Sequence, residues 1–274
     1  MFAANTVLFV PGSRPDRFAK ARAAGAGLTV IDLEDAVAAS DKNSAREAAL
    51  VQVADGGPGW AIRCNAVATA AGIADLSVLI SAEALPSVLL VPMVESPVEL
   101  EIVAKALGER CPDLIPLIET PKGLRHALAI ASMPRVSAVM FGGADFSGEL
   151  GIALAWEPLL AARSVLLLAC AEAKVPAIDV PFIELDNAAG LEAECARSRS
   201  LGFSAKAAIH PAQVAAIEAA FAPSDADVAE AEEAIAAYLG AGEKAIRFKG
   251  RMLEAPVLKR YRAVLSRKGQ NSHA

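Results

Sequence analysis

Two carboxylates, Glu119 and Asp145, are the residues of this chain best placed to do chemistry. Each closes an apolar run, LIPLIE at 114–119 and VSAVMFGGAD at 136–145, of the kind that forms parallel strands buried on both faces. A carboxylate at the carboxyl end of such a strand is poorly placed for a core and well placed for a site. Two on neighbouring strands could bind one Mg²⁺ ion, which usually takes one or two carboxylates and completes its shell with water or substrate oxygens. The alternative is that both are surface acids in loops.

Polar residues also follow the other apolar runs of the chain. Parallel strands would bring them all to one face, because the carboxyl ends of such strands share one side of the sheet. The set comprises Pro11, Gly12, Ser13, Arg14, Asp32, Glu34, Asp35, Arg63, Asn65, Glu95, Asp179 and His210. The opposite strand ends carry no comparable set, which favours a functional cluster.

Arg63, at the end of the run WAIRCN, has two open roles. Its planar guanidinium could hold a substrate carboxylate through two parallel hydrogen bonds, or it could neutralise Asp32 or Glu34. Together with Asp35, these two acids form a dense turn that could orient water bound to a metal. The alternative is that one of the three pairs with a basic residue of the predicted helix at 42–54.

A basic cluster occupies the first predicted strand–helix junction, PGSRPDRFAKA at 11–21. Arg17 and Lys20 fall on one face of a helix there, with Arg14 just before it. A positive patch beside the mouth of a site suits a phosphorylated ligand, whereas the plain alternative is a solvated helix face.

The elements that would position these residues alternate along the chain. Apolar runs predict strands at 6–10, 28–33, 60–65, 87–93, 114–119, 136–142, 176–181 and 204–209. Helical patterns follow them at about 14–24, 42–54, 70–82, 97–107, 121–131, 157–173, 188–200 and 212–221. Eight such units predict an α/β fold, a closed (β/α)₈ TIM barrel with a C-terminal helical extension. The alternative is a doubly wound sheet, but its glycine fingerprint is missing.

We place the barrel at residues 1–222 and the C-terminal helical extension at 223–274, which is not an independent domain. The extension opens with a Ser/Asp cap signal and later contains the turn GRMLEAP at 250–256. It exceeds what eight units need, so it could be a lid, an oligomer arm or a loose tail.

Composition excludes several other classes of protein. The 274 residues are 54% hydrophobic, which is ample for one large core, and the net charge of −6 argues against a nucleic-acid partner. No apolar run reaches the ~18 residues of a membrane helix. The scattered cysteines lack disulfide or zinc spacing, which favours a cytoplasmic protein. They are Cys64, Cys111, Cys170 and Cys195.

Several segments match a known family in order and spacing. They are LFVPGSRPDRFAKA (8–21), DLEDAV (32–37), IRCN (62–65), LIETPKGL (117–124), FGGADFSGELG (141–151), AID (177–179) and GFSAKAAIHPAQV (202–214). With them the chain resembles the citrate lyase β-subunit-like branch of the HpcH/HpaI aldolase family over nearly its whole length. That branch includes citryl-CoA, citramalyl-CoA and malyl-CoA lyases.

The resemblance implies an activity and its cofactor. It implies a (β/α)₈ barrel that cleaves the carbon–carbon bond of a 3-hydroxyacyl-CoA thioester, giving acetyl-CoA and a 2-oxo acid. It implies Mg²⁺, with Mn²⁺ as an alternative, held by Glu119 and Asp145. It also implies a homo-oligomer, a trimer or a multiple of one, in which the C-terminal segment of one subunit covers the neighbour's site.

The same resemblance gives roles to other residues. Arg63 would clamp the carboxylate of the oxo acid, and Asp35 and Glu254 complete the set we predict to be catalytic. Asp32, Glu34 and Glu95 would support the metal from a second layer. The residues implied to contact the substrate and coenzyme A are Arg14, Arg17, Lys20, Gly142, Gly143 and Ala144.

Two departures from the family pattern bear on the substrate. Glu254 stands in the C-terminal turn where the CoA lyases usually have an Asp, and a shift of about 1 Å at a reacting group can lower the rate roughly a hundredfold. Met93 follows Pro92 where the family usually has a Lys. These departures leave two alternatives open: a CoA-independent class II aldolase acting on hydroxy-oxo acids, and a non-catalytic homologue that binds CoA esters. Association with other citrate lyase subunits is also open.

Overall fold

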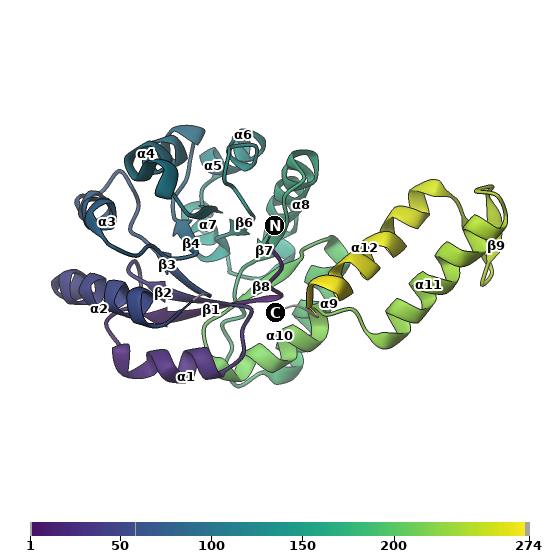
Figure 1. The fold of residues 1–274 in the computed structure, drawn as a ribbon, viewed down its shortest axis with the longest axis horizontal. Coiled ribbons are helices and arrows are strands. Elements are labelled where there is room, and N and C mark those ends of the chain that lie inside the picture. Colours follow the sequence, from purple (N-terminus) through teal and green to yellow (C-terminus); the bar gives the residue numbers. More distant parts are fainter. Residues whose placement is uncertain (1, 58, 272–274) are drawn as a thin grey trace. The chain divides into compact units, whose positions relative to one another are not determined.

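The computed structural model describes residues 2–57 and 59–271, and the chain divides into two compact units, Met1–Ala220 and Phe221–Ala274. The last three residues of the predicted extension lie outside the described residues. In the first unit, eight parallel strands close into a barrel in sequence order, which confirms the predicted TIM barrel. Figure 1 shows the strands at the centre with helices around them.

The strands are short and almost fully buried, as expected for a parallel barrel wrapped by helices. They are β1 (Thr6–Pro11), β2 (Leu28–Asp32), β3 (Trp60–Arg63), β4 (Val88–Val91), β5 (Asp113–Ile118), β6 (Val139–Phe141), β7 (Ala177–Asp179) and β8 (Ala205–Ala208). Side chains from all eight of these strands and from residue 138 fill the barrel interior, among them Val30, Leu90, Ile115 and Ile178.

Helices follow the strands close to their predicted positions. They are α1 (Phe18–Ala23), α2 (Lys42–Asp55), α3 (Ala70–Ser81), α4 (Pro97–Leu107), α5 (Pro121–Arg125), α6 (Ala127–Ala131), α7 (Gly143–Leu150), α8 (Trp156–Ala173), α9 (Ala188–Leu201) and α10 (Val214–Phe221). The single helix expected at 121–131 is two short helices, and α7 has no counterpart among the predicted elements.

Local sequence sets where several helices begin. At α4 the Ser96 hydroxyl accepts the N–H of Val98, the Glu99 carboxylate accepts the N–H of Ser96, and Pro97 occupies the first turn. These groups satisfy backbone donors that a helix start leaves free. The connection between β4 and α4 therefore ends at Ser96.

The strand register aligns the ends of β1, β2 and β3. Pro11 pairs with Asp32 across β1 and β2, and Asp32 pairs with Arg63 across β2 and β3. An acidic and a basic side chain are thus neighbours at the carboxyl ends of two adjacent strands.

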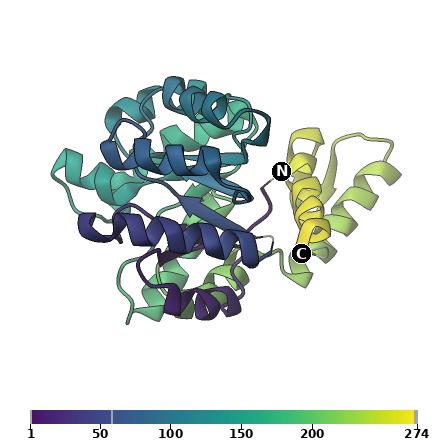
Figure 2. The ribbon, with the colours of Figure 1, turned by 60° about the vertical axis from the view of Figure 1, so that its left-hand side comes forward.

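The second unit has its own small core. It consists of α11 (Asp225–Gly240), the antiparallel pair β9 (Ile246–Phe248) and β10 (Arg251–Leu253), and α12 (Ala255–Asn271). Figure 2 shows α11 and α12 side by side, and Ala234, Tyr238, Leu253 and Leu258 pack between these elements. The hairpin β9–β10 was not among the predicted strands.

All four cysteines are free and buried, so the prediction that they form no disulfide is confirmed. Among the described residues, no helix is long and apolar enough to cross a membrane.

Candidate active site

A cavity of about 390 Å³ lies at the carboxyl ends of the barrel strands. Its polar lining comprises Asp32, Asp35, Arg63, Glu119 and Asp145, and its apolar lining includes Phe9, Leu117, Met140, Val180, Ile183 and Ile209. Five of the residues predicted from strand-end positions are thus brought together in one concave space. Ligand sites of TIM barrels lie at this end of the strands.

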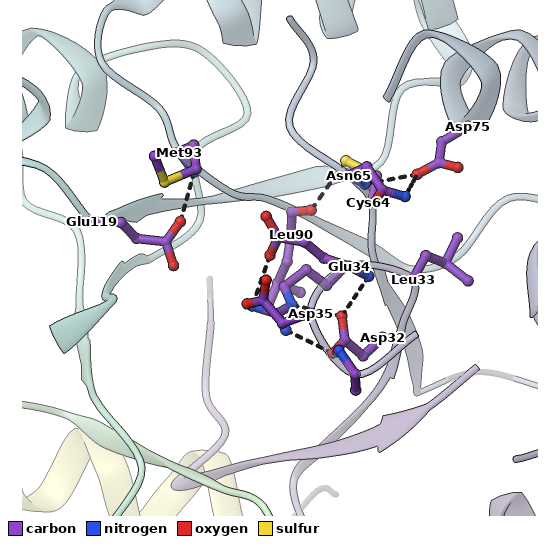
Figure 3. A network of polar contacts seen from close by, with 12 residues as sticks. Asp32, Leu33, Glu34, Asp35, Cys64, Asn65, Asp75, Leu90, Met93 and Glu119 are labelled. Atoms are coloured by element: carbon purple, nitrogen blue, oxygen red, sulfur yellow. Dashed lines mark hydrogen bonds and ion pairs between the residues drawn. The ribbon is translucent and has the colours of Figure 1, made fainter. Parts of the chain in front are cut away.

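Glu119, directly after β5, is buried, with 3% of its surface exposed. Its Oε2 accepts the backbone N–H of Met93 at 2.7 Å (Figure 3). Burial raises the pKa of Glu119 to about 7, and the nearby charge of Asp145 adds to that rise. A buried carboxylate whose pKa is raised is typical of a cation-binding site rather than of a surface loop.

Asp145 does not sit at a strand end or in a loop, as the sequence suggested. It lies in the first turn of α7, which begins two residues after β6 ends. Burial raises the pKa of Asp145, and the charge of Asp35 raises it further. The short helix brings this carboxylate back to the cavity and places it close enough to Glu119 for the two charges to interact.

Gly142 makes room for Glu119. A Cβ atom added to Gly142 would lie 2.5 Å from Glu119 Oε1 and closer still to its Cγ. The backbone of Gly142 has a φ of −92°, a value open to any residue, so the requirement for glycine is the space that Glu119 fills. Gly142 and Ala144 line the cavity, whereas Gly143 is buried behind it, near Phe141, Leu159 and Val180.

Met93 holds Glu119 through its backbone rather than its side chain. Its φ of 54° places it in the left-handed region, which is uncommon for a residue other than glycine. Backbone strain of this kind is kept where the surrounding structure requires it, often at functional sites. The conformation directs the Met93 N–H at the Glu119 carboxylate.

Arg63 makes the ion pairs of the second of the two roles that the sequence left open. Its Nε and Nη2 donate to the two oxygens of Asp32, at 2.7 and 2.6 Å. Its Nη1 lies 2.8 Å from Glu34 Oε2 and 3.2 Å from Asp35 Oδ2. The guanidinium also lies over the ring of Phe9, 5.2 Å from its centre. Arg63 thus neutralises the acidic turn that Figure 3 shows facing Glu119.

Glu34 remains under-compensated despite this neighbour. Burial raises the pKa of Glu34 to about 9, and the charges of Glu119, Asp35 and Asp32 add to the rise, which the nearby charge of Arg63 offsets only in part. The folded protein therefore keeps a proton on Glu34 at neutral pH that the unfolded chain releases near its ordinary pKa.

We expect Glu34→Gln to stabilise the protein increasingly as the pH rises from about 5 to 9. The folded state holds its proton over this range and the unfolded state does not, so the wild-type contribution from Glu34 falls with rising pH. Urea unfolding at several pH values would measure the difference, which should stop growing above pH 9. A glutamine variant that is less stable than wild type at pH 8 would contradict this result.

The basic residues of α2 have other partners. Lys42 donates to the backbone carbonyls of Leu33 and Glu34, and Arg46 binds the carboxylate of Asp75. Neither of them pairs with an acidic side chain of the 32–35 turn. Lys42 instead fixes the backbone of that turn, which sets where its carboxylates point.

Glu95 is not among the described residues that line the cavity, and Glu254 belongs to the second unit. Glu95 is paired with Lys122 at 2.8 Å and accepts the hydroxyl of Thr120 at 3.0 Å, contacts that lower its pKa. Glu254 is exposed and stands directly before α12 in the second unit. His210 accepts the N–H of Ala212 at the start of a short helix.

The predicted basic cluster is divided. Arg17 and Lys20 line a second cavity of about 260 Å³ together with His210, while Arg14 is bound to Asp16 outside it. This second cavity shares Phe9, Pro11 and Ile209 with the first. A positively lined cavity thus adjoins the acidic one. The spacing of Arg17 and Lys20 in the sequence predicted that these two cations lie on one face of a helix.

The residues present fit a hard divalent cation. Glu119 and Asp145 are two carboxylates whose pKa values are raised by burial, so a cation between them would offset that unfavourable charge. Among residues 2–57 and 59–271, no three His, Cys, Asp or Glu side chains form a ready metal cage. A bound ion would therefore keep positions for water or substrate, as Mg²⁺ usually does.

The closed barrel, with two carboxylates in a cavity at its carboxyl end, has a known counterpart. The family model of HpcH/HpaI aldolase/citrate lyase matches residues 5–211. The chain belongs to the HpcH/HpaI aldolase/citrate lyase family.

Similar proteins have related names. The human mitochondrial citramalyl-CoA lyase is 34% identical over 280 residues, which cover 92% of this chain and 82% of that protein. A (3S)-malyl-CoA thioesterase of Cereibacter sphaeroides is 36% identical over 238 residues, which cover 85% of this chain and 82% of that protein. The solved structure of CitE from Mycobacterium tuberculosis in complex with magnesium, acetoacetate and coenzyme A matches with a TM-score of 0.84 and 31% identity, covering 97% of this chain and 98% of that one.

Proposed function

We propose that the protein is a Mg²⁺-dependent lyase that cleaves a 3-hydroxyacyl-CoA thioester of the citryl-, citramalyl- or malyl-CoA type to acetyl-CoA and a 2-oxo acid. The observation that carries the proposal is the pair of cavity-lining carboxylates, buried Glu119 and more exposed Asp145, in a space that adjoins a positively lined one. Family membership and the solved relative with magnesium and coenzyme A support it.

Each group of the cavity would have a distinct role. Glu119 and Asp145 would hold the ion, which supplies Lewis-acid stabilisation of the charge on the substrate hydroxyl oxygen. Arg63, fixed by Asp32 through Nε and Nη2, would turn Nη1 from Glu34 to the one carboxylate of the oxo acid, which leaves it no donor for a second. Asp35 lies at the cavity surface, with 64% of its side chain exposed, where it can accept the hydroxyl proton. In the oligomer that the family resemblance implies, Glu254 of a neighbouring subunit would return a proton to the acetyl-CoA carbanion.

The coenzyme would lie along the second cavity. Arg17 and Lys20 line it, and the residues it shares with the acidic cavity would let a thioester pass from one to the other. Cations placed in this way favour phosphate groups.

We expect Lys20→Met to raise the KM for the CoA ester about threefold to tenfold with little change in kcat, because the lost contact is with a part of the substrate that does not react. The effect should shrink as salt is added, since charges at an exposed site are screened. Lys105→Met, which removes an exposed charge on α4 paired with Glu101, is the matched control. Equal effects of the two substitutions would argue against a coenzyme site here.

The test of the function is an assay of the purified chain with Mg²⁺ against citryl-CoA, citramalyl-CoA and malyl-CoA, with EDTA as control. Acetyl-CoA and the oxo acid are measured separately from free coenzyme A thiol. EDTA-sensitive acetyl-CoA release supports the lyase, whereas thiol release without an oxo acid would indicate a thioesterase, the activity named for one relative. Activity on pyruvate and an aldehyde alone would indicate a CoA-independent aldolase, and tight CoA-ester binding without turnover a non-catalytic homologue.

The setting of the enzyme is a further part of the proposal. A cytoplasmic location is supported by four buried cysteines in the reduced state. A homotrimer, or a multiple of one, follows from the family resemblance, and sedimentation analysis would test it. Co-purification with other citrate lyase subunits would instead indicate a complex.

A further inference from the structure

We infer that the cavity accepts an oxo acid with a single carboxylate and a small apolar substituent or hydrogen, and rejects one with a second carboxylate. This inference rests on the proposed lyase function and narrows its substrate. It would favour a citramalyl- or malyl-type ester, whose oxo acid is pyruvate or glyoxylate, over a citryl-type ester, whose oxo acid is oxaloacetate.

The charged side chains that line the cavity are mostly acidic. Among the described residues that line the cavity, Arg63 is the only cation, against the four acids Asp32, Asp35, Glu119 and Asp145. Glu119 and Asp145 would hold a cation that offsets their charge. A second carboxylate would have to find its own positive partner.

Arg63 has little left to offer such a group. Two of its nitrogens are committed to Asp32 at 2.7 and 2.6 Å, and the third lies 2.8 Å from Glu34 Oε2. Met93, beside Glu119, contributes a backbone N–H and no charge. A carboxylate placed near the acidic turn would therefore be repelled and left without a partner, which is a strong basis for rejection.

The wall contributed by the chain after β7 and β8 is apolar. Val180, Pro181 and Ile183 follow β7, and Ile209 follows β8. Ile183 and Ile209 are 54% and 43% exposed, so their side chains are accessible to a ligand. A methyl group fits against this wall, whereas a carboxylate there would lose hydration and gain no hydrogen bond.

The wall is also held in place. The carbonyl of Val180 accepts Lys206 Nζ at 2.6 Å, and the carbonyl of Phe182 accepts Gln213 Nε2 at 2.7 Å. Lys206 is itself fully buried and paired with Asp179 at 3.1 Å. Buried donors hold the backbone carbonyls on both sides of Pro181. The backbone here therefore cannot easily rotate to direct a polar group at the ligand.

The test compares the three esters under identical conditions. The expected result is a kcat/KM for citryl-CoA roughly a hundredfold or more below that of the better of citramalyl-CoA and malyl-CoA, since juxtaposed like charges are strongly unfavourable. Calorimetry with excess Mg²⁺ measures binding without turnover. Lactate should bind, and malate should bind at least about tenfold more weakly. These are stable hydroxy acids that correspond to pyruvate and oxaloacetate.

A charge-introducing variant tests the cause. Ile183→Lys supplies the missing cation and should raise the citryl-CoA to citramalyl-CoA ratio of kcat/KM about tenfold. Ile183→Met, which has similar reach but no charge, should leave that ratio near its wild-type value. Ile209→Lys gives an independent placement of the same charge should the first variant fold poorly.

The outcomes separate the inference from the function it rests on. Turnover of citryl-CoA within tenfold of the best ester would overturn the inference and leave the lyase function intact. Absence of turnover on all three esters would overturn the function, and the binding of lactate against malate would still decide the inference. Equal binding of the two acids would overturn it.

Discussion

Replacing Asp145 with Asn should lower Mg²⁺-dependent activity by at least about a thousandfold, because it removes one of the two carboxylates that would hold the ion. Folding should not suffer. The pKa of Asp145 is raised by burial and by Asp35, so its contribution to stability falls as the pH rises above its unfolded pKa near 4. At neutral pH the metal-free variant should be as stable as wild type or more stable.

Thermal unfolding with and without Mg²⁺ provides the second measurement for Asp145→Asn. A bound ion stabilises the folded state by mass action, so wild type should show a higher Tm with Mg²⁺ and the variant should not. The matched control is Asp113→Asn, an exposed aspartate at the opposite end of β5. Loss of folding in the Asp145 variant would mean that this carboxylate is structural.

Replacing Gly142 with Ala should lower activity roughly a hundredfold and weaken the dependence on Mg²⁺. The added methyl group would occupy space held by Glu119, lying 2.5 Å from its Oε1, so the carboxylate must move by an appreciable part of an ångström. The backbone itself tolerates alanine at this φ of −92°. The effect should therefore appear as a higher Mg²⁺ concentration for half-maximal activity.

Gly148→Ala is the control for Gly142→Ala. It lies in α7, where an added Cβ meets nothing within 4 Å, so it should retain activity and raise stability slightly through helix propensity. A Gly142→Ala enzyme with wild-type Mg²⁺ dependence would show that Glu119 does not depend on this space.

The barrel and the location of the site follow from sequence for physical reasons. The strands are buried on both faces, so they appear as continuous apolar runs such as LTVID at Leu28–Asp32. Because the fold puts all carboxyl ends together, polar residues that follow these runs had to meet. Glu119 and Arg63 do line one cavity.

The remaining features depend on conformations that the sequence does not display. Helix α7 is built from GADFSGEL, whose two glycines make it look like a loop. Its one clear signal is Gly151, which ends the helix in the left-handed conformation with a φ of 65°. The left-handed backbone of Met93 has no such signal, because nothing in its residue type requires it.

The partner of Arg63 could not be chosen from sequence either. Both a substrate carboxylate and Asp32 match its planar fork equally well in chemistry. The choice is made by the alignment of two strands, which places Asp32 directly beside Arg63. Tertiary geometry of this kind is absent from any local pattern.

That alignment also acts during folding. A shift of β3 by one residue along β2 would turn Arg63 to the other side of the sheet, leaving Asp32 without its cation in a buried position. Removing one partner of a buried ion pair is unfavourable by about 3–5 kcal/mol. The ion pair between Asp32 and Arg63 therefore favours the correct register of β2 against β3 over a register shifted by one residue.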